Sequence, residues 1–241
     1  MPRSTGVRRR LVAVAVASLA LTSACGSAPG TSDPEGVDGL VVPTPSPDPG
    51  DFVEVIDNPY LPLTPGSTWT YEASGSEGEG RVTVTVTDRA RVVAGVRTTV
   101  VSAETTDARG RLVEESQDWY AQDLDGNVWS FGERGTDGDW EAGVDGAQAG
   151  IAMLATPRLG DGYRQEYRAG VAEDQAEVIA TAAELTLDVE GFDRVVKTAD
   201  TTVLQPGLMQ VSYYAPAIGL VLRETVAGGD RRLLLVEHRA G

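Results

Sequence analysis

Few side chains in this chain have the type and position to carry chemistry, and one of them is unique. Cys25 is the only cysteine among 241 residues, and it ends the apolar run "LVAVAVASLALTSAC". A thiol placed there can form a thioether with a diacylglycerol, and cleavage before it exposes an amine that can take a further acyl chain. We therefore predict that Cys25 is lipidated, because two or more acyl chains hold a protein stably on a membrane.

The residues before Cys25 have the features of a secretory signal. Arg3 and the arginines at 8–10 make a basic start, and the apolar core that follows is only about half of the ~20 residues that span a bilayer. The ending "LTSAC" resembles a bacterial lipobox. Residues 1–24 are thus predicted to be a lipoprotein signal peptide, and the mature chain to lie on the outer face of the cell membrane. An unlipidated signal with an accidental cysteine is the alternative.

Catalysis by histidine or thiolate finds little support. His238 is the only histidine and lies near the C-terminus, where we expect it to be solvated, and no G-x-S-x-G motif occurs. Adjacent carboxylates such as Glu114 and Glu115 are expected by chance among 36 acidic residues. We predict no catalytic residue and no enzyme, and a carboxylate-based hydrolase is the least favoured function.

Metal binding is not predicted either. The stretch "DLDGN" places Asp123, Asp125 and Asn127 at alternate positions, as at the start of a calcium loop. However, Val128 stands where that loop needs glycine and Arg134 where it needs glutamate. An Asp-Gly hairpin explains the residues better, so no metal and no cofactor is expected.

Composition limits the partners and the fold. The formal net charge is −16, which disfavours nucleic acid as a partner, and a lone cysteine leaves the domain without an internal disulfide. Residues 25–50 carry the lipidated cysteine followed by a stretch rich in proline and glycine, which we predict to be a disordered tether. Residues 51–241 are then one domain.

The pattern of that domain is β. In "RVTVTVTD", valines alternate with threonines, and turn signals such as Asp125-Gly126 separate the apolar runs. We predict an all-β fold, a single antiparallel multi-stranded curled sheet of half-barrel or β-sandwich-like form. For the Ala- and Glu-rich residues 171–185, one short helix and a long strand are equally supported alternatives.

Several longer stretches resemble an uncharacterised family of bacterial lipoproteins and secreted β-rich proteins. They are "NPYLPLTPGSTWTY", "DWYAQDLDGNVWSFGE", "WEAGVDGAQAGI" and "YYAPAIGLV", within about 57–225. The resemblance implies an extracytoplasmic β-rich domain and favours a strand at 171–185. It carries no activity.

Binding is the function that we predict, without catalysis. The glycine-rich loop 132–150 contains Trp140 and is either a lid over a ligand or a structural plug. A ligand site in the concavity of the sheet would be built from aromatic side chains, namely Trp140, Trp119, Trp129 and Tyr214. The expected ligand is an apolar small molecule or a component of the cell envelope. The alternative is an interaction subunit that docks on an envelope protein complex.

Overall fold

The structure is a computed structural model that describes residues 47–241 except 77, 137 and 188–189. Strands make up most of it, and the 3-10 turn η2 (Pro49–Asp51) is the only helical element in these described ranges. The strands are β1 (Phe52–Val53), β2 (Thr68–Ser74), β3 (Gly80–Val93), β4 (Val96–Asp107), β5 (Leu112–Asp123), β6 (Val128–Arg134), β7 (Trp140–Glu141), β8 (Gln148–Met153), β9 (Gly162–Arg164), β10 (Glu166–Tyr167), β11 (Asp174–Leu187), β12 (Glu190–Thr202), β13 (Met209–Ala215), β14 (Gly219–Ala227) and β15 (Arg232–Arg239).

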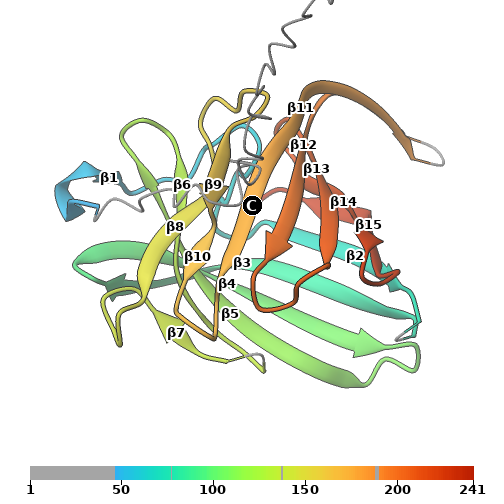
Figure 1. The fold of residues 1–241 in the computed structure, drawn as a ribbon, viewed down its shortest axis with the longest axis horizontal. Helices are drawn as coiled ribbons and strands as arrows, with labels where there is room; N and C mark the ends of the chain where they lie inside the picture. The colour runs from blue at the N-terminus through green and yellow to red at the C-terminus, as the bar shows by residue number, and fades with distance from the viewer. Residues whose placement is uncertain (1–46, 77, 137, 188–189) are drawn as a thin grey trace, which may run out of the picture. The chain divides into compact units, whose positions relative to one another are not determined.

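All these strands belong to one antiparallel sheet that curls into a nearly closed barrel (Figure 1). Thirteen strands follow one another in the order β10-β8-β6-β5-β4-β3-β2-β15-β14-β13-β12-β11-β9, and β1 and β7 pair with β5 and β6 outside this path. The two ends of the path, β9 and β10, are separated in sequence by Gln165 alone. One extended segment therefore pairs with β11 on one side and with β8 on the other, which closes the sheet and leaves little free edge. The predicted all-β curled sheet is confirmed.

Residues 171–185, left undecided between helix and strand, lie mostly in β11. Ala176 pairs with Asp200 of β12 on one side and with Tyr163 of β9 on the other. Ladder hydrogen bonds to both neighbours outweigh the helical preference of alanine and glutamate, as tertiary context commonly does. The helix alternative was wrong.

The barrel interior holds the main hydrophobic core. Trp69 of β2, Val128 of β6 and Val196 of β12 come from distant parts of the ring, yet they pack in one cluster. Only side chains on the inner face can meet in this way. Two further clusters lie elsewhere on the sheet, one around Trp119 and Phe131 and the other around Val195 and Val221.

One end of the barrel is closed by the segment before β2. Ile56 and Leu63 pack into the interior cluster, and Asn58, only 1% exposed, fixes the segment between them. Its Nδ2 donates to the carbonyl oxygens of Gly126 (2.9 Å) and Leu154 (3.1 Å). Its Oδ1 accepts from the backbone N–H groups of residues 60 and 61. Asn58 thereby ties this segment to the loops that contain Gly126 and Leu154, and the segment forms a plug.

The predicted signal peptide, Cys25 and most of the tether lie outside the described residues. Among the described residues of the predicted tether, Pro49 packs beside Gly95, on which a Cβ atom would stand 3.0 Å from the proline ring. Phe52 then pairs with Asp123 in the first strand. Within residues 47–241 and the gaps given above, no helix has the length and apolar character needed to cross a bilayer.

His238 is not a solvated residue of a frayed end, as we had expected. It lies in β15 directly opposite Trp69, and the two rings stack with centroids 5.0 Å apart. Partial burial lowers the pKa of His238. The C-terminal strand is fixed because it completes the ring between β14 and β2, a role that the position of the residue in the sequence did not reveal.

Candidate functional site: the open end of the barrel

The end of the barrel opposite the plug is hollow. A depression of about 630 Å³ lies among the loops that connect β2 to β3, β12 to β13 and β14 to β15. A deeper hollow of about 240 Å³ shares Glu114, Gln210 and Arg231 with it. The deeper hollow is also lined by Ser116 and Arg223. The two hollows adjoin at these shared residues.

Polar side chains line the inner face beside this hollow, on the wall made by β12, β13 and β14. In antiparallel sheets, residues that stand opposite each other point to the same face. Thr198 stands opposite Ser212, and Ser212 stands opposite Arg223. The Nε atom of Arg223 donates to Ser212 Oγ (2.8 Å), and Ser212 Oγ donates to Asp200 Oδ2 (2.5 Å). A hydroxyl thus links the guanidinium to the carboxylate.

Tyrosines extend this network. Burial alone would lower the pKa of Arg223, but its interactions with Tyr214 and Asp200 outweigh that effect, and the pKa is raised. Burial raises the pKa of Tyr71 and of Tyr214 in turn. All of these tyrosines therefore stay neutral, and Arg223 stays charged, at any physiological pH.

A second polar group lies on the wall made by β5, β6 and β10. We call Asp118, Glu133 and Glu166 the acidic trio. Asp118 stands opposite Glu133 in the pairing of β5 and β6. Burial, then the charge of Glu133, raises the pKa of Asp118 to about 8. Burial, then the charges of Asp174 and the other two members, raises the pKa of Glu166 to about 8.

Side chains of both polar groups are largely but not completely buried. Asp118, Glu166 and Arg223 have enough protein around them for burial to perturb their pKa values strongly, yet each keeps part of its surface accessible. That combination is expected of side chains that line an internal space. Perturbed carboxyl groups beside a hollow are a common mark of a functional site.

Some buried polar atoms of this interior have no hydrogen-bond partner among the described atoms. They include Asp200 Oδ1, Thr198 Oγ1 and the hydroxyl of Tyr163. Tyr163 and Asp200 both stand opposite Ala176, one on each side of β11, so a small side chain separates them. Unpaired buried polar atoms are rare in folded proteins, because each costs about 1–3 kcal/mol.

The four aromatic residues predicted to bind a ligand fall into two places. Trp119, Trp129 and Trp140 are 3–6% exposed and share one cluster with Phe131. Tyr214 lies in the barrel interior, next to Arg223. A ligand role for the three tryptophans stays a prediction. Their packing resembles a core, and only Tyr214 belongs to the polar interior.

The segment 132–150, predicted as a loop, is partly strand. β7 pairs with the end of β6, so that Trp140 stands opposite Glu133. Trp140 Nε1 lies near the Glu166 carboxyl and lowers its pKa, although the two groups do not reach hydrogen-bond geometry. The segment is therefore packed against the barrel beside the acidic trio.

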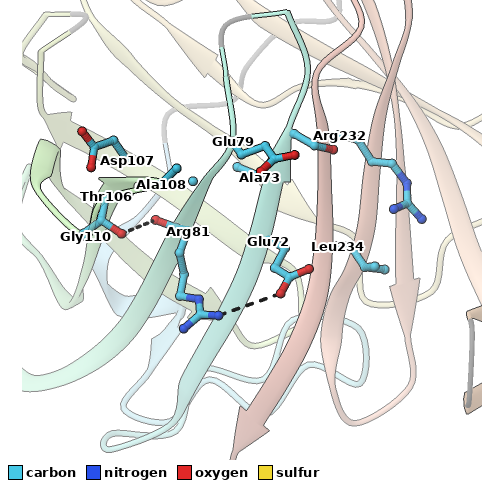
Figure 2. A pocket seen from close by; sticks show the side chains of 12 residues that line it. Glu72, Ala73, Glu79, Arg81, Thr106, Asp107, Ala108, Gly110, Arg232 and Leu234 are labelled. Carbon is cyan, nitrogen blue, oxygen red and sulfur yellow. Dashed lines mark hydrogen bonds and ion pairs between the residues drawn. The ribbon is translucent and has the colours of Figure 1, made fainter.

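Another hollow, of about 540 Å³, lies on the outer face of β2, β3, β4 and β15 (Figure 2). Three of its charged side chains, Arg81, Asp107 and Arg232, already have ion-pair partners. Figure 2 shows Arg81, which approaches Glu72 to 3.8 Å and whose carbonyl oxygen accepts from Thr106. Ion pairs of this exposed kind contribute little. This hollow has the character of a solvated sheet surface.

In the described part of the chain, no group of three or more His, Cys, Asp or Glu side chains is arranged so that it could hold a metal ion. The "DLDGN" stretch forms the turn expected of it. Asp123 accepts from the backbone N–H of Asn127 (2.8 Å) and from Trp129 Nε1 (2.7 Å).

Sequence reasoning missed the polar interior. Asp118, Asp200 and Arg223 were not among the residues singled out, because the local pattern of their strands does not show which face of the sheet is enclosed. The stretches "DWY" and "VSYY" could have indicated them, because each places an acidic or hydroxyl residue beside aromatic residues in a predicted strand of a curled sheet.

Comparison with known proteins identifies no family. No family model matches the chain, and no curated protein matches it. One solved structure with a similar fold is a candidate lipoprotein from Parabacteroides distasonis, with a TM-score of 0.44 and 12% sequence identity, over 76% of this chain and 99% of that chain. This match identifies no ligand.

Proposed function

We propose that the protein is a lipid-anchored extracytoplasmic binding protein that holds a small molecule inside the open end of its barrel, without catalysis. The observation that carries the proposal is the hollow of about 240 Å³ that continues inward from the rim and is lined by Arg223, Gln210 and Ser116. Pockets with a few convergent polar groups are the usual form of a small-molecule site.

The chemistry of the lining refines the prediction made from the sequence. Val82, Ala103 and Leu233 supply apolar surface, but polar side chains make up the larger part. We therefore propose a polar ligand in place of the apolar one first expected. The plugged opposite end supports a binding role, because a barrel closed there is a container with one entrance.

The lipid anchor is proposed from Cys25 and the signal before it. Acyl chains on the cysteine would hold the protein at the outer face of the membrane, and the tether would separate the barrel from the lipid. The ligand is then one that is present in the extracytoplasmic space.

Native mass spectrometry of the full chain, extracted from the membranes of its own host, tests the proposal. We expect an added mass of a small molecule that is lost on mild activation. Ala103→Leu places extra carbon atoms in the hollow and should remove the added mass. Glu104→Leu is the matched control, because Glu104 is the exposed neighbour of Ala103 and points to the opposite face of β4. Equal added mass in both variants would contradict a ligand in this hollow.

A further inference from the structure

The charged lining of the deeper hollow, of about 240 Å³, consists of Arg223, Arg231 and Glu114. Arg231 and Glu114 also line the depression at the rim, so they stand at the entrance, and their charges are of opposite sign. Arg223 lines the deeper hollow and not the rim depression. The charge that a ligand meets beyond the entrance is therefore positive.

We infer that the ligand of the hollow is a small organic anion, an aliphatic carboxylate, whose oxygens accept hydrogen bonds from Arg223. This inference rests on the proposed function and adds the chemical class of the ligand. A guanidinium has N–H donors and no acceptor, and its planar fork matches the two oxygens of a carboxylate.

Arg223 is held in place by the wall from which it projects. Its Nε donates to Ser212 Oγ (2.8 Å), and its side chain also hydrogen-bonds with Tyr214. Ser212 donates in turn to Asp200, which does not line the hollow. A donor that is already fixed by such contacts loses little conformational freedom when a ligand binds, so more of the interaction is available as affinity.

The rest of the lining suits a ligand with one charged end and a short carbon chain. Leu233 stands directly opposite Arg223 in the pairing of β14 and β15, and Ser116 stands opposite Ala103 in the pairing of β4 and β5. Each pair places a donor beside an apolar side chain on the same face. The donors can bind carboxylate oxygens while the apolar side chains contact methylene groups.

The nearby carboxyl groups do little to oppose an anion at neutral pH. Asp118 and Glu166 do not line the hollow, and both are largely protonated at pH 7 because the pKa of each is about 8. Glu114 does line it, but at the entrance, where its Oε1 accepts from Thr136 Oγ1 (2.8 Å). An anion placed next to Arg223 therefore lies inward of the one carboxylate in the lining.

Other ligand classes fit this hollow less well. An organic cation would meet the charge of Arg223, and like charges in a protein interior repel strongly. A neutral alcohol would accept only ordinary hydrogen bonds, whereas those between two ionised groups are roughly twice as strong. The hollow of about 240 Å³ is smaller than the roughly 300–1,000 Å³ of pockets for drug-sized ligands, so the anion must be small.

Calorimetric titration of the full-length protein at pH 7 with three molecules of one chain length tests the inference. The molecules are pentanoate, pentylamine and 1-pentanol, each also titrated into the same detergent solution without protein. We expect measurable binding of pentanoate and at least about tenfold weaker binding of the other two. Because the carbon chain is the same, a difference among them reports on the head group.

Substitutions of one arginine inside the barrel and one outside it locate the effect. Arg223→Gln should weaken pentanoate at least about tenfold, while Arg223→Lys keeps the charge and should keep the preference for pentanoate over pentylamine. Arg232→Gln is the matched control, because Arg232 lines the hollow on the outer face (Figure 2) and pairs with Glu224 (3.2 Å). It should leave the affinity for pentanoate unchanged.

Binding of the amine or of the alcohol within about tenfold of pentanoate would overturn the carboxylate class. The absence of binding by all three would overturn it as well, and so would an unchanged affinity for pentanoate in Arg223→Gln. The proposed function fails separately, when no ligand sensitive to Ala103→Leu is found by native mass spectrometry. Because the comparison among the three molecules uses the unmodified protein, the test does not depend on the folding of the Arg223 variants.

Discussion

Asp118 of β5 and Glu133 of β6 stand directly opposite each other in the wall of the barrel. Two carboxyl groups in this relation destabilise each other when ionised, and burial adds to the cost. A residue that costs stability in an otherwise well-packed fold is more readily understood as part of a site than as part of the scaffold.

Asp118→Asn should stabilise the protein at alkaline pH. The pKa of Asp118 is about 8 in the fold against 3.8 as its ordinary value. Its protonated form therefore contributes stability that is complete below about pH 4 and is lost as pH rises through 8, at about 1.4 kcal/mol per pH unit. An asparagine keeps the neutral form at every pH. Thermal melting from pH 5 to pH 9 should show a gain in Tm that grows with pH.

Asp125→Asn is the control for this experiment, because Asp125 is exposed in the turn between β5 and β6. Its substitution should change Tm little at any pH. A pH-independent effect of Asp118→Asn would mean that the carboxyl group is not buried beside Glu133 as described.

Asn58→Ala should be among the most damaging substitutions at the plugged end. It removes donors to two carbonyl oxygens and an acceptor for two backbone N–H groups, all in a residue that is 1% exposed. Each buried group left unpaired costs about 1–3 kcal/mol, so a loss of at least 3 kcal/mol is expected in denaturant unfolding. Thr64→Ala, exposed on the same segment, should cost less than 1 kcal/mol.

Trp140→Ala and Trp69→Ala should destabilise the protein to a similar extent. The side chains are 3% and 4% exposed, and truncation of a buried tryptophan typically costs about 3–5 kcal/mol. Urea unfolding of both variants provides the comparison. A much smaller loss for Trp140→Ala, together with weaker ligand binding, would instead support the lid that the sequence left open for 132–150.

Cys25→Ser should release the protein from the membrane. A serine hydroxyl cannot form the thioether, so the variant should lose its acyl mass and pass to the aqueous phase in detergent-phase separation. Retention in the detergent phase would refute the anchor.

The sequence predicted those parts of the fold that follow from local pattern. Alternation in β3 and the Asp-Gly turn at 125–126 were sufficient for an all-β antiparallel sheet. The site needed more, because the face to which Asp118 or Arg223 points depends on how far the sheet curls. The barrel is closed by the segment around Gln165, which pairs with strands that are distant from each other in the sheet order, so local sequence cannot predict it. An alternating pattern is the same for a solvated face and for the polar lining of a barrel.

The most direct measurement of the central claim is a crystal structure of the protein as purified from its own host, without added ligand. The account predicts connected density for a small molecule in the hollow lined by Arg223, Gln210 and Ser116, within hydrogen-bond distance of the lining side chains. The account is contradicted if the hollow contains only ordered water and native mass spectrometry of the same preparation detects no bound small molecule.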